Sequence, residues 1–127
     1  MTLNIDFEVP TWEQIYKMLL NLALLIRKDG FLPDIIVGIS RGGCPVARVI
    51  SDLLNNAKVA DVSVEYYSGV AERKAEPTIT RDVSAPVKNQ KVLLVDDVAD
   101  TGRSLQLAKE HLTAQGAMAV KTVTIYY

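Results

Sequence analysis

Apolar and polar residues form blocks along the chain that predict alternating helices and strands. Residues 11–28 repeat apolar side chains at three- and four-residue spacing, which predicts a helix with one apolar face. Thr11, with Gln14 three residues later, is typical of a capping box at the start of that helix. Two short continuous apolar runs, at residues 35–39 and 92–95, suit strands that are buried on both faces of a parallel sheet.

The remaining periodic segments extend the same pattern. Residues 45–54 and 105–116 carry apolar stripes that predict two more helices. Alternation in residues 59–66 predicts a strand with one face more exposed, and residues 120–127 contain a last strand. Trp12, at the start of the first helix, is expected to be a packing anchor.

One stretch, residues 67–89, has no sustained periodicity apart from a short strand candidate at residues 78–80. More than about 15 residues of weak structure inside a compact domain usually form a functional lid or are disordered. We therefore predict one α/β domain over residues 1–127, with a flexible loop at about 67–89. Its core is an open parallel sheet of about four to five strands, flanked by helices and joined by right-handed crossovers.

Composition narrows the classes of function. The formal net charge of −1 and the absence of a basic run give no reason to expect a nucleic-acid partner. The most apolar stretch, residues 15–26, is too short and too interrupted to span a membrane, and the N-terminus has no basic signal-peptide region. Cys44 is the only cysteine, which excludes an internal disulfide and favours a reducing compartment. We expect a cytoplasmic protein without membrane or nucleic-acid partners.

Polar loops follow both of the buried strands, and such loops are where open α/β sheets bind ligands. The turn at residues 101–104 would offer backbone N–H groups and hydroxyls to a phosphate where a helix begins. A blander interpretation is that Asp100 or Thr101 only caps the helix. The adjacent carboxylates of Asp96 and Asp97 repel one another unless hydroxyl donors, such as those of a ribose, or a Mg²⁺ ion receives them.

Two other classes of protein also carry adjacent acids at a strand end. A response-regulator receiver should have its acidic pair near the first strand, whereas the pair here follows the fourth predicted strand. A Walker-type nucleotide-binding protein needs the motif G-x-x-x-x-G-K-[ST], which the chain lacks. Both alternatives are therefore weaker.

The segment VLLVDDVADTGRSL resembles the phosphoribosyl-pyrophosphate (PRPP) motif of type I phosphoribosyltransferases. The segment IIVGISRGGCPVARVI is similar to the pyrophosphate loop of that family, especially of its hypoxanthine/guanine/xanthine branch. The resemblance covers essentially the whole chain. It implies a purine phosphoribosyltransferase that uses PRPP, a purine base and Mg²⁺ in purine salvage, acts as a homodimer, and closes a flexible loop over the reacting sugar.

The resemblance also assigns roles to residues. Asp96 and Asp97 would hold the ribose hydroxyls of PRPP, directly or through Mg²⁺. Asp100 would lie near purine N7 as general acid or base. The residues that would cradle the 5′-phosphate are Ala99, Asp100, Thr101, Gly102, Arg103 and Ser104. Those that would bind pyrophosphate are Ser40, Arg41, Gly42 and Gly43, with Arg41 the best-placed cation.

The chain departs from the family pattern after its last strand. In the family, a base-reading hood with a lysine follows that strand, whereas this chain stops at Tyr127. We therefore expect a reduced hood, for which Lys121 is a weak substitute for the lysine. The chain is then a minimal enzyme that borrows a dimer partner's residues, a truncated form of a longer enzyme, or a non-catalytic module that binds PRPP or a nucleotide. A pyrimidine-using enzyme is a further alternative.

Overall fold

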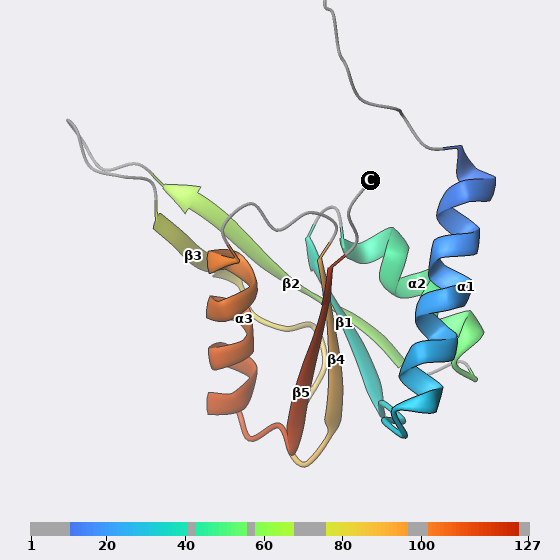
Figure 1. Cartoon of the computed structure of the whole chain (residues 1–127). Coiled ribbons are helices and arrows are strands. Elements are labelled where there is room, and N and C mark those ends of the chain that lie inside the picture. The colour runs from blue at the N-terminus through green and yellow to red at the C-terminus, as the bar shows by residue number, and fades with distance from the viewer. Residues whose placement is uncertain (1–10, 41–42, 56–57, 68–75, 97–101, 125–127) are drawn as a thin grey trace, which may run out of the picture.

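A five-stranded sheet lies between two helical layers in the computed structural model, which describes residues 11–40, 43–55, 58–67, 76–96 and 102–124 (Figure 1). Two helices cover one face of the sheet and a third covers the other. In chain order the elements are α1 (Trp12–Lys28), β1 (Ile35–Ser40), α2 (Gly43–Leu53), β2 (Lys58–Tyr67), β3 (Glu76–Arg81), β4 (Lys91–Asp96), α3 (Arg103–Ala114) and β5 (Ala119–Thr124). The predicted α/β class is confirmed.

The sheet is mostly parallel. Its strand order is β3-β2-β1-β4-β5, and β3 alone among these strands runs antiparallel to its neighbour. The strand candidate at residues 78–80 is therefore confirmed in a longer form, as an edge strand. Val87, which follows it, is buried against α3. Residues 68–75 lie outside the described residues, so the flexible loop stays a prediction.

Helix α1 begins as its sequence predicts. Both bonds of the capping box are present, from Gln14 N to Thr11 Oγ1 at 3.1 Å and from Thr11 N to Gln14 Oε1 at 2.8 Å. The expectation that Trp12 is a packing anchor is wrong, because its side chain is 77% exposed. Trp12 lies in the first turn, where α1 extends beyond the ends of the strands (Figure 1). The first residue of α1 that packs against the core is Ile15, which is partly buried, and the first fully buried residue is Leu19.

The two faces of the sheet build two apolar clusters. Ile36, Leu93 and Val95 pack against α1 and α2, whereas residues such as Val37 and Leu94 alternate to the side of α3. All five are fully or almost fully buried. Each contributes about 1.5–3 kcal/mol of burial free energy, so the central strands β1 and β4 are the most firmly held part of the fold.

The strand order reverses between β1 and β4. From β1 the chain passes to β2 and β3 on one side, and then returns to β4 and β5 on the other. Helix α2 follows β1 on one face, and α3 follows β4 on the opposite face, so the two connections diverge. Such a switch point opens a crevice outside the carboxyl ends of the two strands, and ligands of open α/β sheets bind there.

Candidate functional site

The ends of β1 and β4 bring the two predicted motifs together at the switch point. Gly38 pairs with Val95, so Ser40 and Asp96 end neighbouring strands at nearly the same level. Asp96 is 8% exposed, one of the few buried polar residues among those described. A buried carboxylate is retained only where partners stabilise its charge, and Asp96 has such an interaction within the structure.

The start of α3 provides a second part of the site. Gly102 is the N-cap, with φ of 76°, a left-handed conformation that favours glycine. It has no side chain to cap the helix, and the first intrahelical bond joins Gln106 N to Gly102 O at 2.9 Å. The N–H groups of the first turn therefore point out of the helix, where its dipole favours an anion. The interpretation that Asp100 or Thr101 is the N-cap residue is not supported.

A tyrosine that the sequence pattern did not single out as a site residue contacts this helix start. Ser104 Oγ donates a hydrogen bond to Tyr66 Oη at 3.0 Å. Tyr66 lies near the end of β2, and its side chain turns to the α3 side of the sheet, as those of Val62 and Val64 do. The only sequence signal for this contact was the alternation in β2.

A polar cluster supports the other loop of the site. Ser40 Oγ donates a hydrogen bond to Asp61 Oδ2 at 3.1 Å, and an Arg81 guanidinium nitrogen lies 3.4 Å from the same oxygen. The three residues come from β1, β2 and β3, so side chains of three strands hold the start of the predicted pyrophosphate loop in place. A polar pocket of about 630 Å³ adjoins the cluster, lined by Ser40, Ser63, Val64, Glu65 and Arg81.

The structure thus brings four predicted site residues to one edge of the sheet, and places two more within helices that begin there. Ser40 and Asp96 end strands, Gly102 is the N-cap of α3, and Ser104 lies in the first turn of that helix. Gly43 is the first residue of α2, and Arg103 is the first residue of α3. The other predicted site residues lie outside the described residues: Arg41, Gly42, Asp97, Ala99, Asp100 and Thr101.

The described residues bear on two further properties, metal binding and the crossing of a membrane. No group of three or more His, Cys, Asp or Glu side chains that could hold a metal ion occurs among them. Magnesium commonly needs only one or two protein carboxylates together with substrate phosphates, and Asp96, at the end of β4, is a described carboxylate of that kind. None of the described helices is long and apolar enough to cross a membrane.

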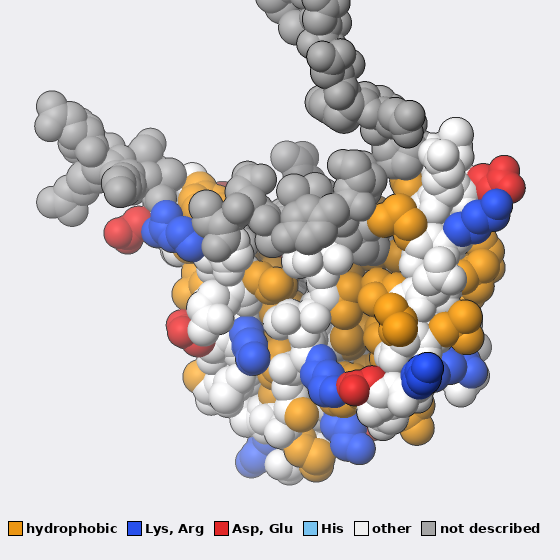
Figure 2. All heavy atoms as spheres, viewed as in Figure 1, with side chains coloured by type: hydrophobic (Ala, Val, Ile, Leu, Met, Phe, Trp, Pro, Cys, Tyr) orange, Lys and Arg blue, Asp and Glu red, His pale blue; other side chains and the backbone are white. Residues whose placement is uncertain are grey.

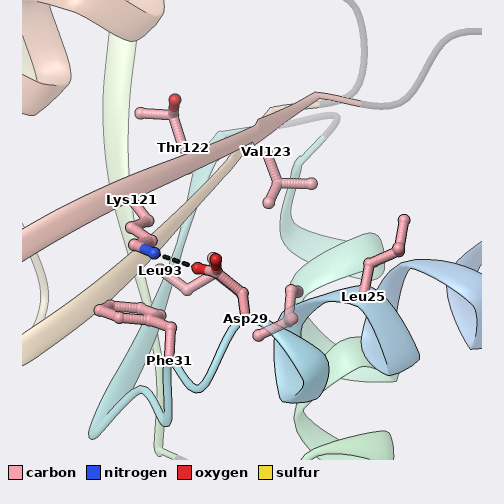
Figure 3. Close-up of a pocket in the computed structure, with 8 residues that line it drawn as sticks. Leu25, Asp29, Phe31, Leu93, Lys121, Thr122 and Val123 are labelled. Carbon is pink, nitrogen blue, oxygen red and sulfur yellow. Dashed lines mark hydrogen bonds and ion pairs between the residues drawn. The ribbon is translucent and has the colours of Figure 1, made fainter.

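An apolar groove lies away from this site, between the second half of α1 and β5. It encloses about 190 Å³, and its apolar lining includes Leu25, Phe31 and Val123 (Figure 3). Hydrophobic side chains gather between these two elements in Figure 2. None of the predicted site residues lines the groove, so the groove is separate from the candidate site at the ends of β1 and β4.

Lys121 is engaged in this groove. Its ammonium pairs with the Asp29 carboxylate and lies 5.1 Å from the centre of the Phe31 ring (Figure 3). Lys121 pairs in the sheet with Leu93, three residues before Asp96. Its backbone therefore lies about 10 Å along the strand from the level of Asp96, where the site begins. Lys121 is thus a poor substitute for a base-reading lysine.

A mostly parallel sheet with a buried acid at a strand end, followed by a helix with a glycine N-cap, is typical of proteins that bind phosphorylated sugars or nucleotides. Comparison with known proteins narrows the class. Residues 9–127 match the family described as the phosphoribosyl transferase domain. The chain belongs to this family.

Similar proteins include purine enzymes. The chain is 35% identical over 116 residues to a hypoxanthine-guanine phosphoribosyltransferase of Lactococcus lactis, covering 89% of this chain and 62% of that protein. It is 33% identical to a xanthine-guanine phosphoribosyltransferase of Idiomarina loihiensis, covering 97% and 71%. The crystal structure of a purine phosphoribosyltransferase from Pyrococcus horikoshii matches with a TM-score of 0.81 and 31% identity, covering 91% of this chain and 74% of that one. The chain spans less than two thirds of the Lactococcus relative's length.

Proposed function

We propose that the protein transfers the phosphoribosyl group of PRPP to a purine base of the hypoxanthine/guanine/xanthine type, releasing pyrophosphate and forming a nucleoside 5′-monophosphate in purine salvage. The observation that carries this proposal is the meeting of Ser40, Asp96 and the open start of α3 at one switch point. The purine activity that the names of similar proteins state supports the choice of base.

In this proposal, each group of residues at the carboxyl ends of the strands binds one part of PRPP. Asp96 and Asp97 accept hydrogen bonds from the ribose hydroxyls. The first turn of α3, from Gly102 to Ser104, binds the 5′-phosphate through N–H groups and the Ser104 hydroxyl. The loop that begins at Ser40 binds pyrophosphate, and Arg41 provides the neutralising cation there. Mg²⁺, held by the two carboxylates, would supply positive charge that neutralises the pyrophosphate.

In the reaction, a purine nitrogen forms a bond to the anomeric carbon while the bond from that carbon to pyrophosphate breaks. Positive charge develops on the sugar ring and negative charge on the leaving group. The protein's contribution is to hold the sugar at both ends and to stabilise the leaving charge with loop N–H groups and Arg41. Asp100 takes or gives the proton at purine N7.

We further propose a homodimer that acts in the cytoplasm without a membrane or nucleic-acid partner. The described surface supports the dimer, because large apolar side chains are exposed on α1 and just after it. The single cysteine supports a reducing compartment. The exposed apolar residues of this region are Trp12, Tyr16, Leu24, Leu25 and Leu32.

The test is pyrophosphate release. The protein is incubated with Mg²⁺, PRPP and, separately, hypoxanthine, guanine, xanthine, adenine and uracil, with Asp96→Asn as the inactive control. We expect release with at least one oxopurine, and about a hundredfold less with the variant. PRPP binding without release for any base would indicate a non-catalytic binding module instead. Release with uracil alone would indicate a pyrimidine enzyme.

A further inference from the structure

Tyr66 and Ser104 join two elements at the phosphate end of the proposed site. Tyr66 belongs to β2 and Ser104 to the first turn of α3, and their hydroxyls are 3.0 Å apart. The alternation of β2 turns the Tyr66 side chain to the α3 side, and Figure 1 shows the end of β2 running past the end at which α3 begins.

The direction of this hydrogen bond matters for binding. Ser104 donates and Tyr66 accepts, so the tyrosine keeps its own O–H proton for a further acceptor. Tyr66 is 47% exposed, so its hydroxyl is accessible from solvent. A phosphate monoester at the start of α3 accepts hydrogen bonds, so the Ser104 proton turns to it when it binds, and the Tyr66 O–H then donates to Ser104 Oγ in place of accepting from it.

We propose that Tyr66 is a positioning residue for the 5′-phosphate of the substrate, acting through Ser104. This inference rests on the proposed function of the site. A serine side chain rotates freely about χ1 unless a partner holds its oxygen, and holding the Ser104 oxygen in place before the ligand arrives lowers the entropy lost on binding. The phosphate does not change during the reaction, so Tyr66 stabilises bound substrate and transition state equally. Its loss then raises KM and leaves kcat unchanged.

The first variant is Tyr66→Phe, which removes only the hydroxyl. A net hydrogen bond of ordinary strength predicts a rise of about fivefold in KM, or in Kd, for PRPP. The kcat, the KM for the base and the midpoint of thermal unfolding should stay at the wild-type values. Thr113→Val is the matched control, because it also removes one exposed hydroxyl, which bonds to Lys109 O near the end of α3 that lies away from Ser104. It should change none of these quantities.

A double-mutant cycle with Ser104→Ala tests whether the tyrosine acts through the serine. We expect the combined loss of PRPP affinity to be smaller than the product of the two single losses. An unchanged KM and Kd in Tyr66→Phe would overturn the inference, as would independent losses or an equal loss in kcat.

Calorimetry separates this inference from the proposed activity. A wild-type protein that binds PRPP without turnover, with weaker binding in Tyr66→Phe, would refute the transferase proposal and uphold the role of Tyr66. A wild-type protein that binds no PRPP would refute both.

Discussion

Replacing Asp61 tests how the predicted pyrophosphate loop is anchored. In Asp61→Asn the amide oxygen can still accept from Ser40 Oγ, but the charge facing Arg81 is lost. Because the Arg81 side chain is 69% exposed, its ion pair contributes only about 0.2–1 kcal/mol. In Asp61→Ala the half-buried Ser40 hydroxyl also loses its acceptor, which adds about 1 kcal/mol. The free energy of unfolding should fall by roughly 0.5 kcal/mol in the first variant and 1–2 kcal/mol in the second.

Urea unfolding gives these free energies, and PRPP titration gives the effect on the loop. Asp61 N–H donates to Ser84 Oγ and Ser84 N–H donates to the Asp61 carbonyl, each at 2.9 Å. Neither bond uses the replaced carboxylate, so the strand should stay in place. We expect Asp61→Ala to weaken PRPP binding more than Asp61→Asn does, with Arg81→Gln as a variant that removes only the ion pair. The reasoning is refuted if Asp61→Ala matches the wild type in both measurements, or if the asparagine variant loses as much as the alanine variant.

Three further predictions concern chemistry, pH and packing. Asp100→Asn should lower kcat far more than PRPP affinity, and equal losses in steady-state kinetics and calorimetry would count against proton transfer. A hydrogen bond from His111 and a second from Gln115, at 2.7 Å each, hold the pKa of Asp82 below its ordinary value of 3.8. The ionised carboxylate therefore stabilises the fold at pH values above that ordinary pKa, and this stability is lost as the pH falls through the lower pKa of the folded state. Asp82→Asn should therefore flatten the acid side of a plot of the unfolding midpoint against pH. An unchanged slope would contradict this prediction. Leu94→Ala, at a fully buried position, should cost about 2–5 kcal/mol in urea unfolding, and a loss below 1 kcal/mol would mean that the core is misassigned.

Local patterns predicted the elements whose structure depends on nearby residues. The capping box of α1 depends on two residues three positions apart, and both of its bonds form. The apolar run at residues 92–95 predicted the most buried part of β4. Strand β3 was harder to predict, because an exposed edge strand buries few side chains and its sequence therefore shows little apolar pattern. Only the centre of this strand was predicted. Its antiparallel pairing with β2 has no local signature.

The contacts within the site depend on tertiary structure. Asp61 and Ser40 are 21 residues apart, and Tyr66 and Ser104 are 38 apart, so no local spacing could relate them. Asp61 is a polar residue within an apolar stretch of β2, which indicated that one face of the strand does not pack in the hydrophobic core. What that face touches follows only from the order of the strands.

Register within the sheet explains why Lys121 lies away from the strand ends at which the two predicted motifs meet. Ser40 and Asp96 reach the same edge because β1 and β4 are adjacent, parallel and nearly in step. Lys121 belongs to the next parallel strand, but its register places it beside Leu93, where its charge pairs with Asp29 against α1. A lysine that reads a base at this edge would have to follow Thr124, the partner of Asp96, because only the strand ends reach the crevice. Under the proposed function, the sugar-phosphate half of the site would therefore follow from strand order, whereas base recognition would require residues beyond the strand ends.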